Sequence, residues 1–462
     1  MANTELTRTP SSTTNRKTYT FSAWVKRATI SSGYPRIFAY DYADTDRFEF
    51  FFYNTDELQI EHVNNNSVDI DIHTTRRFKD TGAWYHIVLA VDTTQSTAAD
   101  RVKLYINGVQ ETTLTNAAGS SPTYPPQDSN TIVNYASGSK FFIGETGYSS
   151  GGQNFDGCMS HIHFVDGAAL APTVFGSTDS TTGEWKINTE PSYTVGTNGF
   201  FILKDGNSLT DQSTNSNNFT VSNGSVTKTE DCPSNVFCTM NPLSHKTSWT
   251  LTNGNNTFNG ATVTDWKHGC GATLGASSGK WYWEVKWTSG DSYSILGVLP
   301  IDQYWRCAKG DTGTDVYSKT NSYQLSASSA GDKYNYVASA GSGIQRTIND
   351  IFMIAVDFDN KKMWFGENGT WDNSGNPATG ANPTWDTSEF PSDWDNGFVP
   401  FCQSYKISAV TEFQFNFGNG YFGTTAVATN SGNGYAGAEG SSIFNYQPPT
   451  GYSALSTKGL NS

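Results

Sequence analysis

The sequence lacks several features that would place it in common protein classes. Its 462 residues include six cysteines without a CxxC pair, so neither a disulfide framework nor a structural zinc site is indicated. No stretch approaches the roughly 20 apolar residues that span a bilayer, and Met1–Arg8 has no apolar core of a secretory signal. No tract rich in Ala, Glu, Lys, Leu and Arg carries a heptad, which excludes a coiled coil.

Positive charge is scarce as well. The chain has 29 Lys and Arg residues against 43 Asp and Glu residues, for a formal net charge of −14. The acidic excess extends over both halves, so binding to phosphate backbones would be opposed electrostatically. We therefore expect no nucleic-acid partner and no insertion into a membrane.

Aromatic residues and glycine are abundant instead. The chain has 28 Phe, 23 Tyr, 13 Trp and 44 Gly, and this aromatic surface is enough to form cores and argues against disorder. Strand-like patterns dominate, with no convincing helical periodicity up to residue 165. They cover Tyr19–Val25, Arg47–Tyr53, Ala83–Val91, Lys140–Gly144, Met159–Val165, Gly279–Trp287, Ser294–Leu299, Ile351–Phe358, Lys362–Phe365 and Glu412–Phe417. The sequence therefore predicts an all-β protein.

Turn signals divide and connect these strands. Asn107-Gly108 predicts a two-residue hairpin turn, and alternation places Trp281, Trp283, Val285 and Trp287 on one face of their strand. Turn residues cluster at Cys232–Cys238 and Asn241-Pro242. They predict a boundary between domains 1–231 and 232–462. A bridge between Cys232 and Cys238 is one alternative, but reduced thiols are expected for a protein assembled in the cytoplasm.

Five motifs of the first half occur in a characteristic order: Phe21–Arg27, Trp84–Val88, Leu104–Gly108, Phe142–Gly144 and Phe155–Ile162. With these motifs the first half resembles the laminin-G-like, concanavalin A-like lectin/glucanase fold. The resemblance covers about residues 15–170 and keeps the family order, so it implies an antiparallel jelly-roll sandwich. The stretch Val195–Val221 is similar to the extension that follows this domain in many marine phage structural proteins.

The second half contains a series of short motifs: Gly279–Val285, Ile295–Val298, Ile354–Asn360, Lys362–Gly369, Pro400-Phe401 and Phe415–Gly418. With these motifs it resembles a SPRY domain, a bent β-sandwich that is used for protein recognition. The match covers roughly residues 255–425, and its specificity lies in the joint order of its pieces. The tail Tyr446–Leu460 is similar to the closing segment of SPRY-like phage proteins. Together the resemblances imply two antiparallel β-sandwiches in tandem.

Catalytic signals are weak. Laminarinase-type enzymes place two catalytic Glu residues on one strand as Glu-x-Asp-x-x-Glu, but no Glu in this chain is followed two positions later by Asp. Glu49, Glu145 and Glu284 are expected at the surface or at sheet edges. The pair His161 and His163 shares one strand face and could ligate a metal with Asp166 or Asp156. We favour a solvent-facing pair with Ile162 in the core.

Calcium is the more credible ion. Asp41, Asp44 and Asp46 place three carboxylates in a short loop, and oxygen-rich loops suit a hard cation. The alternative is a solvated turn, so no cofactor is assigned beyond this candidate calcium site.

Ligand binding to sugars requires exposed aromatic faces with neighbouring polar groups. Candidates from the first half lie in or beside expected loops, and candidates from the second half lie in the Asn-, Gly- and Pro-rich stretch 371–398. By contrast, Trp24, Trp84, Trp283 and Trp364 lie in strands and should be core. The candidate ligand-binding residues are Tyr40, Tyr42, Tyr53, Tyr148, Trp371, Trp385 and Trp394.

The sequence thus favours a non-enzymatic virion-surface protein, either a tail fibre or a capsid-surface adhesin. It would be assembled in the host cytoplasm and recognise host glycans or surface proteins through loops on rigid sandwiches. Expected partners are other virion proteins, the host ligand and further copies of the chain, by analogy as a trimer. Two alternatives stay open: a capsid-decorating protein without a host ligand, and a polysaccharide depolymerase.

Overall fold

The computed structural model forms two compact units, residues 1–228 and 229–462. The structure describes residues 4–30, 33–146, 153–204, 208–244, 249–260, 269–290, 294–301, 347–386, 397–404, 409–427 and 434–461, and the backbone of three strands between 323 and 341. Each unit is considered by itself below.

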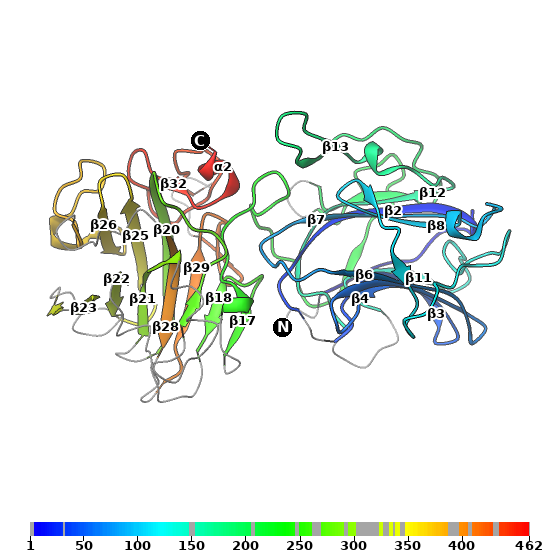
Figure 1. Ribbon diagram of the computed structural model, residues 1–462, viewed down its shortest axis with the longest axis horizontal. Helices are drawn as coiled ribbons and strands as arrows, with labels where there is room; N and C mark the ends of the chain where they lie inside the picture. Colours follow the sequence, from blue (N-terminus) through cyan, green and yellow to red (C-terminus); the bar gives the residue numbers. More distant parts are fainter. Residues whose placement is uncertain are drawn as a thin grey trace. The chain divides into compact units, whose positions relative to one another are not determined.

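The first unit is a sandwich of two antiparallel sheets, visible in Figure 1 as a layer with β2, β7, β8 and β12 above a layer with β3, β4, β6 and β11. The eight-stranded sheet has the order β10 (Leu114–Thr115), β6 (Ser67–Arg77), β5 (Glu57–Asn64), β4 (Asp46–Phe52), β3 (Arg36–Ala43), β11 (Lys140–Ile143), β1 (Glu5–Arg8) and β16 (Thr220–Asn223). The six-stranded sheet has the order β15 (Phe200–Ile202), β12 (Gly157–Asp166), β2 (Thr18–Arg27), β7 (Tyr85–Asp92), β8 (Val102–Ile106) and β9 (Val109–Gln110).

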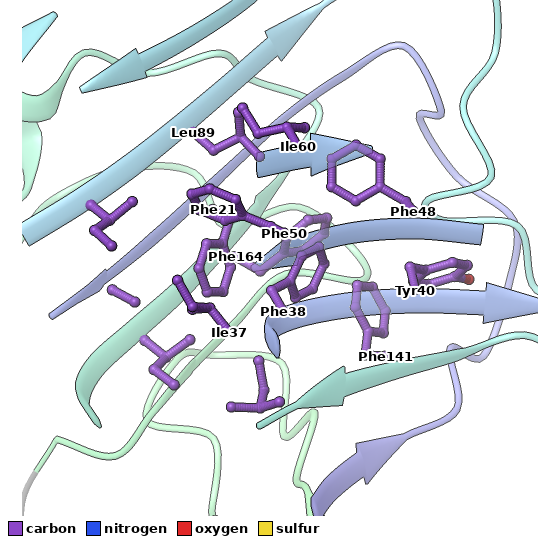
Figure 2. Packing of buried hydrophobic residues seen from close by; sticks show 14 of the residues in the cluster. Phe21, Ile37, Phe38, Tyr40, Phe48, Phe50, Ile60, Leu89, Phe141 and Phe164 are labelled. Atoms are coloured by element: carbon purple, nitrogen blue, oxygen red, sulfur yellow. The ribbon is translucent and has the colours of Figure 1, made fainter. Parts of the chain in front are cut away.

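An aromatic core joins these two sheets. Alternation along β4 directs Phe48, Phe50 and Phe52 inward, because successive side chains of a strand point to opposite faces. Across the sandwich, the rings of Phe21 and Phe38 stack with centroids 4.7 Å apart. Figure 2 shows how such rings from both sheets interdigitate with aliphatic side chains. Each buried ring removes a large apolar area from water, so this core holds the sheets together.

Short elements surround the first sandwich. They include the hairpin β13 (Gly176–Thr178) and β14 (Trp185–Ile187), and the 3-10 turns η1 (Ala98–Asp100) and η2 (Pro172–Val174). Phe175 and neighbouring side chains pack on Val88 and Val165 and form a second apolar layer over the six-stranded sheet. The outer face of that sheet is therefore partly covered by chain that follows β12.

The second unit is also a sandwich. One sheet has the order β17 (Thr250–Thr252), β18 (Thr257–Asn259), β29 (Glu412–Asn416), β20 (Lys280–Ser289), β25 (Ile351–Asp357), β26 (Lys362–Glu367) and β27 (Thr370–Trp371), and β32 (Ser453–Ala454) pairs in parallel with β20. The other has the order β19 (Gly269–Gly271), β28 (Phe398–Ser404), β21 (Ser294–Pro300), β22 (Tyr323–Ser326), β23 (Asp332–Asn335) and β24 (Ala338–Gly341).

The C-terminal segment covers the outer face of the first of these sheets. Phe444 and Tyr452 pack on Tyr282 and Trp364, which project away from the core between the sheets. The segment also contributes β32 and ends with α2 (Thr457–Leu460). The remaining short elements are η3 (Pro242–Ser244), η5 (Asp372–Ser374) and the pair β30 (Tyr421–Phe422) and β31 (Thr425–Ala426).

The predicted all-β class with tandem sandwiches is confirmed. The hairpin at Asn107-Gly108 joins β8 to β9. The alternating face of β20 contributes Trp281, Trp283, Val285 and Trp287 to one core. The strand tryptophans Trp24, Trp84, Trp283 and Trp364 are all buried as expected. Among the described residues, Cys158, Cys232, Cys238, Cys270 and Cys402 form no disulfide with one another. Within the described ranges, helices are too short and too polar to cross a membrane.

Candidate functional site

The outer face of the eight-stranded sheet in the first unit carries a pocket of about 430 Å³. Strands β3, β4 and β5 supply half of its lining residues, and the loops around them supply the other half. Its lining consists of Tyr34, Arg36, Asp44, Arg47, Glu49, Phe51, Tyr53, Gln59, Glu61, Ala117, Thr146 and Gln153. The pocket thus combines aromatic rings with a set of charged and amide groups.

The strand register explains why these side chains meet. Arg47, Glu49 and Phe51 alternate with the core phenylalanines of β4, so all three point to the outer face. Glu49 lies directly opposite Glu61 on β5. Cross-strand partners of this kind have Cβ atoms about 5 Å apart. Two carboxylates therefore meet on the outer face of the sheet, in the floor of the pocket.

Two arginines neutralise this carboxylate pair. Arg36 donates from Nε and Nη2 to Oε1 of Glu49, both at 3.0 Å. Arg47 donates from Nε to Oε2 of Glu49 at 3.2 Å and from Nη2 to Oε1 of Glu61 at 2.6 Å. The guanidinium carbon of Arg36 also lies 4.1 Å from the ring centroid of Phe51. Because Arg36 and Glu49 are almost fully buried, this network is rigid and fixes the floor of the pocket.

Aromatic rings form one wall. The rings of Tyr34 and Tyr53 meet edge to face with centroids 5.2 Å apart, and Tyr34 also contacts Phe51 at 6.3 Å. The amide of Asn54 donates to the Tyr34 hydroxyl at 3.2 Å. Burial, with a smaller contribution from Tyr34, raises the pKa of Tyr53. The two partly exposed rings offer apolar faces beside polar groups.

The aromatic residues chosen from the sequence fall in different surroundings. Tyr53 lines the pocket, whereas Tyr42 is exposed at the end of β3 and contacts Tyr135. Tyr40 and Trp385 are fully buried and belong to the two cores, so a surface role for them is corrected to a packing role. Trp371 is half-buried and packs on Tyr282.

Two further predictions, Tyr148 and Trp394, lie outside the described residues.

The candidate calcium loop is held by protein partners. Asp41 is buried and accepts a hydrogen bond from the Thr146 hydroxyl. Asp46 accepts from the Thr45 hydroxyl at 2.7 Å and from the backbone N–H of Asn65 at 3.0 Å. Asp44 is exposed and lines the pocket. Across the described ranges no three His, Cys, Asp or Glu side chains converge as metal ligands, so the three aspartates do not form a calcium cage here.

The histidine pair on β12 is buried rather than solvent-facing, which corrects our expectation. A register shift between Ser160 and His163 changes the local alternation. The His163 ring stacks on Phe201 at 3.8 Å, and its Nδ1 lies 2.6 Å from the Tyr193 hydroxyl. Chain that follows β12 covers this face of the six-stranded sheet, and such coverage is not visible in the strand sequence.

His86 lies 2.9 Å from the Ser22 hydroxyl, but the pair is not arranged for nucleophilic catalysis. The indole of Trp185 donates to Nδ1 of His86 at 2.9 Å, and an indole N–H can only donate. The proton of the neutral ring therefore resides on Nε2 and points to Ser22, whereas a general base must accept there. Burial lowers the pKa of His86 to about 3, and the Trp24 ring stacks on the imidazole with centroids 4.8 Å apart.

The three glutamates expected at surfaces or edges are buried, which is a second correction. Glu49 lies in the pocket network. Glu145 packs beside Thr146, whose backbone N–H donates to its carboxylate at 3.2 Å. Glu284 lies at the centre of β20 beneath the C-terminal segment. A surface position is expected for each glutamate because a carboxylate is rarely buried without hydrogen-bond or ion-pair partners. In the structure these partners come from distant parts of the chain.

Sequence reasoning missed Arg36, Arg47 and Glu61. The alternation in Arg47–Tyr53 places Arg47 and Glu49 on the same face of the strand. Their pairing with Glu61 and Arg36 depends on the register of β3, β4 and β5. The signal available from sequence was an unusual density of charge on one face of an otherwise aromatic strand.

Comparison with known proteins supports the fold of the first unit. Residues 2–175 match the family model of the concanavalin A-like lectin/glucanases superfamily. This match covers less than half of the chain and includes β1 to β12. No match was found among curated proteins. The first unit is therefore similar to lectin-like domains, and this fold suggests a role in binding carbohydrate or protein.

Solved structures show more distant similarity. The SPRY domain of human HERC1 is 13% identical with a TM-score of 0.28, over 38% of this chain and 96% of that chain. The TRIM65 PSpry domain is 12% identical with a TM-score of 0.28, over 39% and 91%. A heptameric SAP-like pentraxin from Limulus polyphemus is 17% identical with a TM-score of 0.27, over 45% and 92%.

Proposed function

We propose that this protein is a non-enzymatic virion-surface protein that binds a host glycan through the pocket of its first unit. The observation that carries the proposal is the pocket itself, in which two tyrosine rings stand beside a fixed set of charged and amide groups. Sugars present apolar C–H faces and polar hydroxyls together, and such a site accommodates both. The lectin-like fold of this unit supports the same role.

The contacts of the two glutamates support binding rather than hydrolysis. Glu49 and Glu61 face each other across neighbouring strands, and a retaining glycosidase also places two carboxylates close together. Hydrolysis also needs one of the two to act as a protonated acid. Here Arg47 pairs with both, and Arg36 pairs with Glu49 as well. Such pairing engages both carboxylates in hydrogen bonds with the arginines, and this fixed arrangement suits the orientation of ligand hydroxyls.

Replacing Tyr53 with alanine should weaken glycan binding about tenfold, because the ring supplies much of the stacking surface. One aromatic contact typically contributes about 1–1.5 kcal/mol, and losing it corresponds to a decrease in affinity of about that size. The measurement is a glycan array followed by calorimetry of the best ligand, with Tyr421→Ala in the second unit as the matched control. Release of new reducing ends from that ligand would instead establish a depolymerase.

The virion assignment rests on the resemblance of Val195–Val221 and of the tail Tyr446–Leu460 to phage structural proteins. We expect immunogold labelling with an antibody against residues 232–462 to decorate intact particles. Label at the tail supports a fibre with the host glycan as partner. Label over the head supports a capsid-surface position among other virion proteins, and particles without label would refute the assignment.

A further inference from the structure

The arginine donors of the pocket are already engaged within the protein. All three nitrogens of Arg36 donate, two of them to Glu49 and Nη1 to the Tyr34 carbonyl at 2.5 Å. All three nitrogens of Arg47 also donate, to Glu49, to Glu61 and to the Asp44 carbonyl at 2.6 Å. The two cations therefore serve the floor of the pocket and offer little to an anionic ligand.

Acceptors, in contrast, are left over. Oε1 of Gln153 is buried against the pocket and has no hydrogen-bond partner within the described residues. Glu61 uses only Oε1 for Arg47, and its side chain retains about a fifth of its exposure. The exposed carboxylate of Asp44 makes no hydrogen bond or ion pair to other described side chains. A buried amide oxygen without a partner is costly and points to a donor that is supplied by a ligand.

The charge of the pocket also favours a ligand that donates hydrogen bonds and carries a positive charge. The ionisable lining comprises two arginines against Asp44, Glu49 and Glu61, which leaves a formal excess of one negative charge. The whole chain carries a net charge of −14. Approach of a polyanion would be opposed at both levels, whereas a cation would be attracted. The faces of Tyr34 and Tyr53 are also suitable neighbours for an ammonium group.

We propose that the pocket selects glycans with free, unacetylated amino groups over neutral N-acetylated and over acidic glycans. The inference rests on the proposed function and names its ligand class. An ammonium group offers three donors and no acceptor, and this complements Glu61, Asp44 and Gln153. An acetylated nitrogen offers one donor and no charge, and a uronate offers a negative charge to a site whose two arginines are already engaged.

The test measures binding of the full chain to three oligosaccharides by calorimetry at about pH 6, below the pKa of an ordinary α-amino group. The probes are a β-1,4-linked glucosamine oligomer, its fully N-acetylated form and a galacturonate oligomer of equal length. We expect the amino form to bind at least tenfold more tightly than the other two. Equal or tighter binding of the acetylated or acidic oligomer overturns the inference.

Variants separate the pocket from general attraction between a polycation and an acidic protein. Glu61→Gln should weaken binding of the amino form about fivefold to tenfold and leave the acetylated form within about twofold. Asp100→Asn removes the same charge from η1, outside the pocket lining, and should change neither. Asp44→Asn at an exposed position serves as a second variant if Glu61→Gln does not fold. Equal losses in the pocket variants and in Asp100→Asn contradict the inference.

Failure of the inference and failure of the proposed function give different results. Binding of all three oligomers without preference, reduced by Tyr53→Ala, retains the glycan site and removes its selectivity for amines. Binding that Tyr53→Ala does not alter, or no binding of any oligomer together with a negative glycan array, removes the glycan site itself and the inference with it.

Discussion

Replacing Glu284 with alanine should lower the free energy of unfolding of the second unit by about 3–5 kcal/mol. The carboxylate is fully buried and accepts four hydrogen bonds. Oε1 receives the backbone N–H of Tyr446 at 2.7 Å and the hydroxyl of Tyr282 at 3.0 Å. Oε2 receives the backbone N–H of Asn445 at 2.8 Å and the side-chain amide of Asn416 at 3.2 Å.

Truncation leaves these four donors without an acceptor beneath the C-terminal segment. Glu284 therefore joins that segment to β20 by hydrogen bonds, while Phe444 and Tyr452 join it by packing. We expect hydrogen exchange of peptides from 440–456 to accelerate more than exchange in β26, because the lost acceptor serves the segment directly. Urea unfolding supplies the free energy. Glu412→Gln, at a half-buried position on β29, is the control and should cost less than about 1 kcal/mol.

The same residue gives the second unit a pH dependence. Burial raises the pKa of Glu284 to about 7, although its four hydrogen bonds act in the opposite direction. Since the folded pKa lies above the ordinary value, the stabilising contribution is fully present below that ordinary value and is lost as pH rises through about 7. Tyr282 and Tyr446, whose pKa values are also raised by burial, stay neutral in this window.

Stability of the native chain relative to Glu284→Gln should thus fall between about pH 5 and pH 8. If the difference in the free energy of unfolding between the native chain and Glu284→Gln stays constant or grows with pH, the carboxylate titrates at its ordinary value.

Replacing Asp56 with asparagine should destabilise the first unit by about 3 kcal/mol, because it leaves a buried guanidinium without a counter-charge. Asp56 and Arg27 are both almost fully buried and lie 2.9 Å apart. Arg27 also donates to the carbonyl of Phe78 at 2.6 Å and stacks over Phe52 at 4.2 Å. Asparagine keeps the shape of the side chain and tolerates the positive φ of 78° at this position, so the change isolates the charge.

A matched control exists in the same unit. Asp128 pairs with Lys17 at 3.3 Å and has a positive φ of 59°, but both side chains are exposed. Asp128→Asn should therefore cost less than about 1 kcal/mol. The double variant Arg27→Leu with Asp56→Asn should recover part of the loss, because both charges are removed together. Thermal unfolding of the three variants and the native chain tests this, and equal effects of Asp56→Asn and Asp128→Asn would contradict it.

The candidate site shows how far local sequence information extends. Alternation in Arg47–Tyr53 predicts a strand with Phe48 and Phe50 on one face, and this is what the core contains. The aromatic candidates were chosen by their position in expected loops. This choice included Tyr53, which lines the pocket, and also Tyr40, which is core. An aromatic ring near the end of a strand can project either into the core or to the outer face of the sheet. The register irregularities between β3 and β4 and the packing of β11 determine which face it takes.

The sequence by itself determined the all-β class, the strands and the hairpin turn at Asn107-Gly108, because period-two alternation and turn chemistry are local properties of the chain. Only the tertiary structure decided which polar groups became buried partners. Glu49 meets Arg36 and Glu61 through strand register, and Glu284 meets Asn445 and Tyr446 across some 160 residues of sequence. Burial of a carboxylate depends on hydrogen-bond donors that other parts of the fold supply. The local sequence of the strand that carries the carboxylate gives no information about those donors.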